Sequence, residues 1–422
     1  MQAGFAPKKS PSGAVDDLEG VVPEALTPLE VGLLTGCRDK HYVYGLTTAL
    51  LSKGIYVDLI GNDEVDSPDF HGMPKLNFLN FGGAPKESDG LVRKILRIVR
   101  YYARLISYTI LTKEKLFHVL WNFKFEYFDR TLLMLYFKLL GKKIVFTAHN
   151  VNAGKRDAND SLLNRLTLRI QYRLADHIFV HTTQMRRELL EGFKVRECAV
   201  TVIPYGINNS VPNTKLTPTD AKRHLGIKDG KRTVLFFGKI GPYKGLEHLI
   251  AAFQMIVSRN AEYRLLIVGK PRGGSEKYVN EIRDATSRDA IHERVIQRIE
   301  YIPDHEVELY FKAADVLVLP YTYIFQSGVL FLGYSFGLPV IATNVGSLRD
   351  DVIEGETGSL CNPSDPDDLA KSIEAYFESD LFTNLSRRRQ HIRDYAHGRH
   401  SWDKVGELTQ NVYADLLRRD RP

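Results

Sequence analysis

Cysteine is scarce in this sequence, and long hydrophobic runs are absent from it. The 422 residues include three cysteines, and no two of them form a C-x-x-C pair. This spacing argues against a disulfide framework and against a zinc site built from cysteines, and it is typical of a reducing compartment. No run of about 18 apolar residues occurs, so no transmembrane helix is expected. The chain is therefore predicted to be cytoplasmic.

Dense tracts of positive charge are also missing, although the chain is mildly basic. Lys and Arg number 57 against 51 Asp and Glu, which gives a net charge of +6. An excess of this size does not indicate nucleic-acid binding, and it is compatible with anionic small ligands or an anionic membrane surface. The N-terminal segment lacks the apolar core of a signal peptide, and residues 1–26 are predicted to form a disordered leader.

Short apolar segments alternate with helical patterns along the chain, which is typical of an α/β protein with parallel sheets. The pattern breaks over 208–232, where prolines and polar residues predict a linker with one short helix around Ala221–Leu225. We therefore expect two Rossmann-like domains, 27–207 and 233–396, with a ligand cleft between them. Apolar residues at helical spacing over 397–422 predict an amphipathic helix that packs back on the N-terminal domain.

The predicted strands are rich in Val, Ile and Phe, as expected for strands that are buried on both faces of a sheet. They are 31–35, 55–60, 116–121, 143–149, 177–182 and 199–204 in the first half, and 233–238, 264–269, 295–302, 315–320 and 339–343 in the second. A helix is predicted over 44–54, where Gly54 ends it. Ligands of such sheets bind beyond the carboxyl ends of the strands.

The segment FFGKIGPYKGLEHLI, residues 236–250, joins an apolar strand to a helix through a turn that contains glycine. This order directs free backbone N–H groups and the positive end of the helix dipole toward an anion. Lys239 follows Gly238, Lys244 precedes Gly245, and the two lysines can converge on neighbouring phosphates. Alternatively, the segment is an ordinary turn between strand and helix, and its lysines are only solvated.

Nearly the whole chain resembles glycosyltransferase family 4, the retaining enzymes of GT-B fold. Besides the turn above, the matching stretches are AADVLVLP (313–320), FGLPVIATNVGSLRDDV (336–352) and EGETGSLCNPSDPDDLAKSI (354–373). The resemblance implies that Lys239 and Lys244 bind the diphosphate of a nucleotide-sugar donor. It also implies sugar transfer to an acceptor hydroxyl in polysaccharide or glycolipid assembly, with the donor as co-substrate and no cofactor.

The family's usual pair of glutamates, Glu-x7-Glu, is missing from this chain. The positions expected for it hold Ile324 and Leu332, which cannot accept a hydrogen bond from a sugar or ribose hydroxyl. Nearby, Gln326, Ser327 and Gly328 offer an amide, a hydroxyl and a backbone that can approach a phosphate closely. We interpret them as a variant donor loop in which Gln326 or Ser327 replaces the lost carboxylate. The alternative is a degenerate, inactive site.

The strand over 143–149 ends in His149, and Asn150 follows it. Because ligands bind beyond the carboxyl ends of parallel strands, we expect His149 to point into the cleft. The family has a comparable His-Asn or His-Asp near the donor sugar, which implies a catalytic role for His149 and places Asn150 beside the acceptor. A purely structural histidine is the alternative. Recognition of the donor base is expected around 298–302, beginning at Arg298.

The loop after the first strand, TGCRDKHYVYG, corresponds to the family's acceptor loop. Arg38, Lys40 and His41 make it unusually basic, which suits an acceptor that carries a phosphate. A solvated surface loop is the alternative. The acceptor implied by the resemblance is a sugar, a glycan or a lipid-linked molecule.

Residues 91–111 carry four arginines along one helix face, and no acidic residue interrupts them. The arginines are Arg93, Arg97, Arg100 and Arg104, beside an apolar face of Val92, Ile95, Leu96, Val99, Ala103 and Ile106. A basic amphipathic helix can lie on anionic lipid, so peripheral attachment to the inner face of a membrane is one prediction. The other is that the apolar face belongs to the core and the arginines lie in water.

Three functions follow from these patterns. A family 4 hexosyltransferase comes first, and it is expected to be metal-independent because no Asp-x-Asp cluster lies near the site. A nucleotide-sugar epimerase or a glycosyl phosphorylase of the same fold comes second, although the chain is far shorter than typical phosphorylases. A catalytically silent, surface-associated partner of an active transferase comes third. Slow release of nucleoside diphosphate from the donor would distinguish an active transferase from a silent partner.

Overall fold

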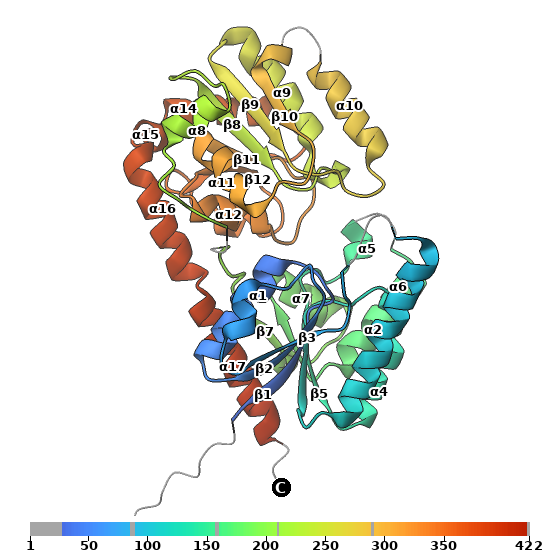
Figure 1. Ribbon diagram of the computed structural model, residues 1–422. Coiled ribbons are helices and arrows are strands. Elements are labelled where there is room, and N and C mark those ends of the chain that lie inside the picture. The colour runs from blue at the N-terminus through green and yellow to red at the C-terminus, as the bar shows by residue number, and fades with distance from the viewer. Residues whose placement is uncertain (1–27, 85–88, 157–159, 209–210, 288–290, 420–422) are drawn as a thin grey trace, which may run out of the picture.

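The computed structural model describes residues 28–84, 89–156, 160–208, 211–287 and 291–419. The predicted leader, 1–26, lies outside them. The described chain forms two α/β domains, one above the other in Figure 1, and the last two helices run down one side of both. The prediction of two Rossmann-like domains with parallel sheets is confirmed.

Within the described residues, the N-terminal sheet has seven strands in the order β3-β2-β1-β4-β5-β6-β7, all parallel. They are β1 (Glu30–Leu34), β2 (Tyr56–Gly61), β3 (Leu76–Asn80), β4 (Leu116–Val119), β5 (Lys143–Thr147), β6 (His177–Val180) and β7 (Val200–Val202). The helices of this half are α1 (Lys40–Ser52), α2 (Leu91–Leu111), α3 (Glu126–Phe128), α4 (Met134–Leu139), α5 (Ala153–Arg156), α6 (Leu162–Leu174) and α7 (Thr183–Gly192). Single turns are η1 (Pro68–Gly72), η2 (Asp129–Leu133) and η3 (Glu197–Ala199).

The described C-terminal sheet has six parallel strands in the order β10-β9-β8-β11-β12-β13. They are β8 (Arg232–Phe237), β9 (Tyr263–Val268), β10 (Val295–Arg298), β11 (Val316–Leu319), β12 (Val340–Thr343) and β13 (Gly358–Cys361). The helices are α8 (Pro218–His224), α9 (Leu246–Arg259), α10 (Glu276–Thr286), α11 (Asp304–Ala313), α12 (Gly328–Ser335), α13 (Leu348–Asp351), α14 (Pro366–Glu378), α15 (Asp380–Thr383), α16 (Leu385–Arg399) and α17 (Trp402–Arg418). Single turns are η4 (Pro242–Lys244) and η5 (His292–Arg294).

Two edge strands, β3 and β13, were not expected from the sequence. β3 reads LNFLN and is only partly buried, and β13 reads GSLC. Each pairs with one neighbour and not two. An edge strand needs fewer β-branched residues than a central one, so its apolar signal is weaker.

The helix after β1 begins four residues earlier than the predicted start at Tyr44. Asp39 caps it, because the Asp39 side chain accepts a hydrogen bond from the backbone N–H of Tyr42. The helix carries its buried residues toward β1, and Gly54, at φ +82°, follows its end. This cap places the basic loop at the carboxyl edge of the N-terminal sheet.

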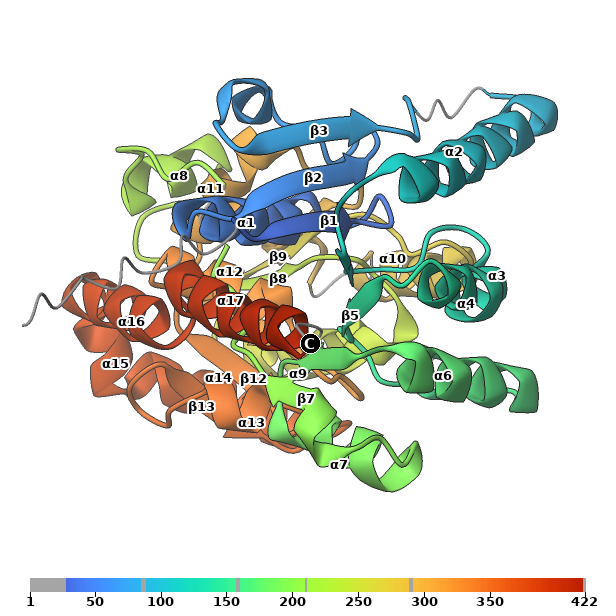
Figure 2. The same ribbon diagram turned by 90° about the horizontal axis from the view of Figure 1, so that it is seen from below.

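The segment between the two strand series packs against the C-terminal domain. Its helix α8 buries Ala221 in the C-terminal core, and Lys222 forms an ion pair with Asp315 at 2.8 Å. The last helix, α17, returns to the N-terminal domain, where Val405 and Tyr413 join the core that contains β1. Figure 2 shows α17 lying under the N-terminal sheet, close to β1. In the described part of the chain, no helix has the length and hydropathy to span a membrane.

Candidate functional site

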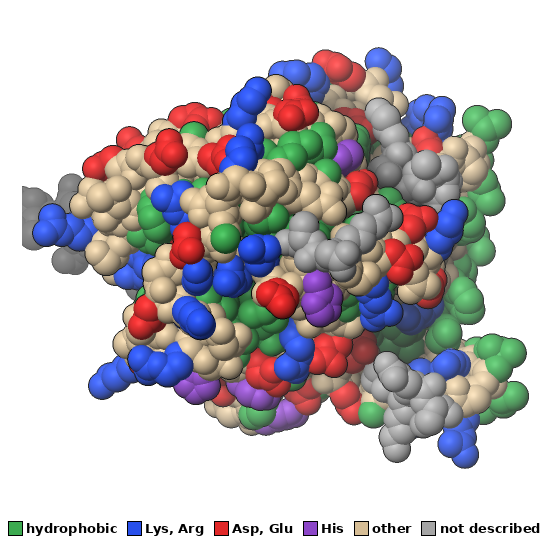
Figure 3. All heavy atoms as spheres, turned by 90° about the horizontal axis from the view of Figure 1, so that it is seen from above, with side chains coloured by type: hydrophobic (Ala, Val, Ile, Leu, Met, Phe, Trp, Pro, Cys, Tyr) green, Lys and Arg blue, Asp and Glu red, His purple; other side chains and the backbone are tan. Residues whose placement is uncertain are grey.

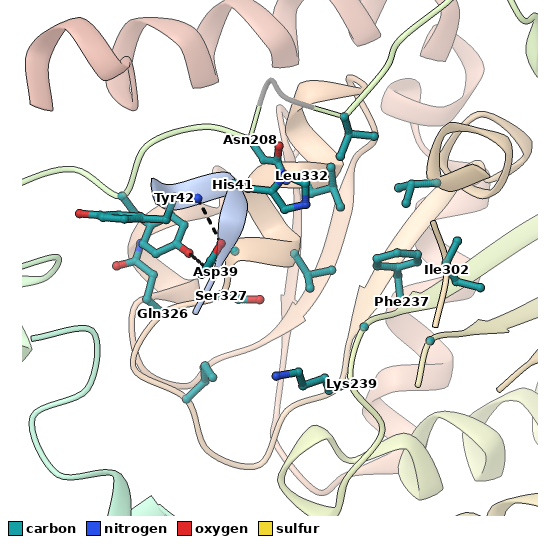
Figure 4. Close-up of a pocket in the computed structure, with 18 of the residues that line it drawn as sticks. Asp39, His41, Tyr42, Asn208, Phe237, Lys239, Ile302, Gln326, Ser327 and Leu332 are labelled. Carbon is teal, nitrogen blue, oxygen red and sulfur yellow. Dashed lines mark hydrogen bonds between the residues drawn. The ribbon is translucent and has the colours of Figure 1, made fainter. Parts of the chain in front are cut away.

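A cleft of about 480 Å³ lies between the two domains. Most of its wall comes from loops at the carboxyl ends of parallel strands, where such sheets bind ligands. Figure 4 shows Lys239 extending from the C-terminal domain toward the space that Asp39 and Tyr42 border from the N-terminal domain. The lining includes Asp39, His41, Tyr42, Asn150, Tyr205, Asn208, Phe237, Gly238, Lys239, Tyr243, Lys244, Gly269, Lys270, Tyr301, Ile302, Asp304, Ile324, Gln326, Ser327, Gly328, Leu332 and Trp402.

The turn between β8 and α9 has the predicted order of strand, glycine-containing turn and helix. Gly245, at φ +61°, ends η4 and is the N-terminal cap of α9. A side chain cannot fit there, because a Cβ at Gly245 would lie 2.0 Å from the carbonyl oxygen of Pro320. The first N–H group of α9, that of Leu246, donates to the Tyr278 hydroxyl at 3.1 Å, and the cleft wall at this turn includes Lys244 but, among the described residues, neither Gly245 nor Leu246.

The two predicted lysines both line the cleft, but their surroundings differ. The Lys244 side chain is buried, and its Nζ lies 3.7 Å from the centroid of the Tyr321 ring, a cation–π contact. Burial, followed by the positive charge of Lys270, lowers the pKa of Lys239 below its usual value. An anion in the cleft would relieve this repulsion.

Lys270 is a cleft residue that the sequence prediction missed. It follows Gly269 at the end of β9, just as Lys239 follows Gly238 at the end of the neighbouring β8. The repeated Gly-Lys at two strand ends was a signal that could have identified it. Adjacent parallel strands bring such pairs to the same sheet edge, so three lysines line the donor side.

The variant donor loop does line the cleft, together with the two apolar residues that stand where the glutamates were expected. Ile324 and Leu332 are nearly buried in the wall. The Gln326 amide Nε2 lies 3.4 Å from Oδ2 of Asp351, and within the described residues its buried Oε1 has no hydrogen-bond partner. Ser327 is buried, with its Oγ 3.4 Å from the Tyr321 hydroxyl.

Asp351 is a carboxylate that holds the donor loop from behind. Burial raises the pKa of Asp351 to about 7, against hydrogen bonding by Ser347, which lowers it. Since Gln326 donates to Asp351, the amide oxygen of Gln326 is turned away from that carboxylate, and among the described residues this buried oxygen has no hydrogen-bond partner.

His149 is not among the described residues that line the cleft, so its predicted position at the wall is corrected. Its ring stacks on Trp121, with centroids 4.0 Å apart, and its Nδ1 lies 3.1 Å from Nε2 of His181. Burial, then the neighbouring histidines, hold the pKa of His149 well below 6.5, so its ring is neutral. Tyr42 lines the cleft, and the centroid of its ring lies 4.6 Å from the centroid of the His149 ring. Asn150 lines the cleft itself.

The three basic residues of the acceptor loop have different positions. Only His41 lines the cleft among them, and its Nε2 lies 3.3 Å from Oδ1 of Asp304 in the opposite domain. Burial lowers the pKa of His41, but hydrogen bonding and charge from Asp304 outweigh it, so the pKa is raised overall. Arg38 pairs with Glu126 at 3.3 Å, and Lys40 begins α1 beside the wall.

Arg298 does not line the cleft within the described residues, so the contact with the donor base that was expected to begin there is not supported at Arg298. Its guanidinium pairs with Glu300 and, at 3.4 Å, with Glu306. The residues of this stretch that do line the cleft are Tyr301 and Ile302. An aromatic and an aliphatic side chain can cover the face of a base.

Two aromatic residues from distant parts of the sequence complete the junction of the domains. The Tyr205 ring stacks on Phe331 of α12, with centroids 5.7 Å apart. The Trp402 indole N–H donates to the carbonyl of Ile207 at 2.9 Å. Trp402 fills a slot beside Gly45, where a Cβ would lie 2.0 Å from the indole ring. No local sequence signal distinguishes either residue from ordinary core.

Three comparisons with known proteins concern the family and the fold of this chain. Residues 40–211 match the model described as Glycosyltransferase Family 4, and residues 219–399 match the model described as Glycosyl transferases group 1. The D-inositol 3-phosphate glycosyltransferase of Corynebacterium diphtheriae is 26% identical over 289 residues, which are 66% of this chain and 66% of that relative. The aligned region thus spans just under two thirds of the relative's length.

Solved structures share the fold at low sequence identity. Sucrose-phosphate synthase from Thermosynechococcus elongatus superposes with a TM-score of 0.74 at 20% identity, covering 93% of this chain and 100% of that one. HepE of Anabaena, solved in complex with UDP and glucose, has a TM-score of 0.71 at 16% identity and covers 92% and 100%. The expected GT-B architecture is confirmed.

Proposed function

Because this chain belongs to glycosyltransferase family 4, whose two models together match most of its length, we propose that it is a retaining glycosyltransferase. It transfers a hexose from a nucleoside-diphosphate sugar to an acceptor hydroxyl. The observation that carries the proposal is the group of three lysines, Lys239, Lys244 and Lys270, at the wall beside the start of α9. Cations and helix N–H groups together stabilise a departing diphosphate.

The proposed reaction needs positioning and charge stabilisation more than covalent chemistry by the protein. The bond between the anomeric carbon and the β-phosphate oxygen breaks, and the acceptor oxygen forms a bond to that carbon on the same face. The acceptor proton passes to the departing phosphate oxygen. The lysines lower the energy of this step by neutralising charge that develops on the diphosphate. The proposal therefore requires no metal ion and no cofactor.

Uridine diphosphate is the nucleotide that we propose for the donor. HepE, which shares the fold, was solved with UDP and glucose, and Tyr301 and Ile302 of this chain line the cleft and offer a surface for a base. Gln326 takes the place of the missing glutamates, because it lines the cleft and its amide oxygen, which can accept from a sugar or ribose hydroxyl, has no hydrogen-bond partner among the described residues. His149 acts as a positioning residue through its contact with Tyr42.

The acceptor that we propose is a lipid-linked sugar or glycan, in glycolipid or polysaccharide assembly. The acceptor wall contains Asp39, His41, Tyr42 and Asn150, which supply donors and acceptors for sugar hydroxyls. These side chains make the wall polar, as a carbohydrate requires. The relative from C. diphtheriae takes its name from a phosphate-bearing acceptor, and Lys40 at the edge of the wall suits one.

A catalytically silent partner is the second candidate, and one observation favours it. Ile324 and Leu332 line the cleft and are 8% and 7% exposed, where the family pattern has two glutamates. An apolar wall there removes hydrogen bonds to the donor. A silent partner would not release UDP from UDP-glucose, whereas a transferase does so slowly even without an acceptor.

Alanine substitution of the lysines tests the proposed function. We expect Lys244→Ala and Lys239→Ala each to lower UDP release from UDP-glucose by about a hundredfold or more, because lost charge stabilisation of a transition state costs about 3 kcal/mol or more. Lys228→Ala, an exposed lysine of the same domain, is the matched control. Thermal unfolding confirms that all variants fold, and a chelator should leave turnover unchanged.

Near-normal turnover in either cleft variant would contradict the diphosphate assignment. The base is tested separately with UDP, GDP and ADP sugars, since a ligand that binds only the native state raises the melting temperature. A shift with a GDP or ADP sugar and none with UDP-glucose would contradict the proposed base and leave the lysine assignment standing.

A further inference from the structure

An apolar and basic surface covers one side of the N-terminal domain. It consists of the outward side chains of α2, of η2 with α4, and of α6, and we refer to it as the three-helix surface. Its large hydrophobic side chains that are at least half exposed are Leu91, Val92, Ile95, Leu96, Val99, Ile110, Leu111, Leu132, Leu139, Leu162, Leu163 and Leu166. Figures 1 and 2 both place these helices together at the right-hand side of the domain.

The exposed leucines are not surplus core, because the same helices already bury a separate set of side chains. Leu105 of α2, Phe137 of α4 and Leu168 of α6 lie in one core cluster beneath the surface. The sequence left open whether the apolar face of α2 belongs to the core or lies at the surface. The helix packs through residues such as Tyr101, while its predicted apolar face at Val92 and its neighbours stays in solvent.

The three helices lie side by side and form one continuous surface. The Tyr136 hydroxyl of α4 donates to the carbonyl of Ile106 in α2 at 3.0 Å. Arg130 of η2 donates to the Asn164 side chain of α6 at 2.9 Å. Figure 3 shows hydrophobic side chains along the right-hand edge of the molecule, on the side that these helices occupy. An apolar area contributed by three separate elements is larger than the scattered single residues that solvent-exposed surfaces usually carry.

The charge of this surface has one sign. The sequences of α2, α4 and α6 contain no Asp or Glu, but they contain nine Lys and Arg residues. Within the described residues, no ion pair involves the exposed cations Arg93, Lys94, Arg100, Arg169 or Arg173. Other positions are paired, as Arg97 is with Asp89. Leucines among unpaired cations are the composition of a surface that binds anionic lipid.

The position of the surface relative to the cleft follows from the topology. Because α2 follows β3 and α6 follows β5 through α5, both helices begin at the carboxyl edge of the sheet. The cleft opens at that same edge. The most exposed leucines lie at both ends of the helices. Leu91 and Leu162, at 74% and 84%, are the first residues of α2 and α6, whereas Leu111 and Leu139, at 81% and 78%, are the last residues of α2 and α4. A flat object on the three-helix surface therefore reaches the rim of the cleft.

We propose that the three-helix surface docks the enzyme on an anionic phospholipid bilayer, with the leucines in the headgroup and acyl boundary and the arginines at lipid phosphates. A second copy of the chain is disfavoured as the occupant. A twofold contact through this face would bring two rows of cations together with no carboxylate between them. The docking itself does not depend on the proposed reaction, but it holds the acceptor side of the cleft next to the membrane.

Vesicle sedimentation of the full chain tests the proposal. The probes are vesicles of equimolar phosphatidylglycerol and phosphatidylcholine, and vesicles of phosphatidylcholine alone. We expect binding to the anionic vesicles and at least tenfold weaker binding to the neutral ones. Each cation near the surface contributes about fivefold in affinity, so Arg93→Gln, Arg100→Gln and Arg169→Gln combined should weaken binding on the order of a hundredfold.

The leucines are tested by combining Leu91→Gln, Leu139→Gln and Leu162→Gln. Each withdrawn leucine should cost about tenfold or more, because the burial of a whole leucine side chain is lost. The control that is matched to the arginine variant replaces three exposed cations of the C-terminal domain, Lys228, Lys371 and Arg387, with glutamine. This control should bind vesicles as the natural chain does.

Solution turnover separates this proposal from the proposed function. All three combined variants should release UDP from soluble UDP-glucose at the natural rate, since none of the changed residues lines the cleft among the described residues. The docking proposal would be overturned if the control variant lost as much affinity for anionic vesicles as the arginine variant. It would also be overturned if the natural chain bound anionic and neutral vesicles equally. A third result would overturn it as well: the natural chain does not bind vesicles, it forms a dimer in sedimentation velocity, and the leucine variant is a monomer.

Discussion

Gly245 allows a sharp test of how the turn before α9 serves the donor site. Its backbone lies at φ +61° and ψ 29°, a conformation that costs an alanine about 1–2 kcal/mol. An added Cβ would also lie 2.0 Å from the carbonyl oxygen of Pro320, whereas real contacts of this kind stay above 3.0 Å. In Gly245→Ala, the start of α9 must therefore move by at least about 1 Å away from β11. A displacement of this size near reacting groups costs about a hundredfold in rate.

Gly230→Ala is the matched control for backbone strain. Gly230 lies in the same domain at φ +79°, and nothing lies within 4 Å of the position that its Cβ would take. Both variants should lower the melting temperature. Only Gly245→Ala should lower kcat/KM for UDP release from UDP-glucose by about a hundredfold, because only there does the helix start move. Equal kcat/KM in the two variants would refute the reasoning that α9 must be held at Pro320.

Two further predictions concern the walls of the cleft. Gln326→Ala should weaken binding of UDP-glucose by up to about tenfold and leave the affinity for UDP unchanged, because one hydrogen bond to the sugar is lost; an equal loss for both ligands, measured by calorimetry, would contradict a contact with the sugar and place Gln326 at the ribose or the diphosphate. The raised pKa of His41 means that its ion pair with Asp304 is complete below about pH 6.5 and is lost as the pH rises through that raised pKa. The radius of gyration from X-ray scattering should therefore increase with pH as the domains separate, and His41→Gln should remove this dependence; the same increase in the variant would show that another group controls closure.

Much of the donor side could be predicted from local sequence, because its parts are adjacent in the chain. A strand, a glycine at positive φ and a helix start occur together over 236–250, so their order alone specifies where Lys239 and Lys244 lie. The repeated Gly-Lys at Lys270 belongs to the same kind of signal. Arg38 on the acceptor side and Arg298 at the expected base site were harder, since their carboxylate partners, Glu126 and Glu300, could not be assigned before the fold was known.

The sequence by itself determined the α/β class, most of the central strands and the place of the phosphate turn, because periodicity and glycine act over a few residues. Only the tertiary structure decided which side chains share the cleft. His149 stands at the expected strand end, yet packing against Trp121 keeps it out of the described wall, whereas Trp402 reaches the cleft from the far end of the chain. Burial also separates the two faces of α2, since the amphipathic pattern cannot show which apolar residues the neighbouring helices will cover.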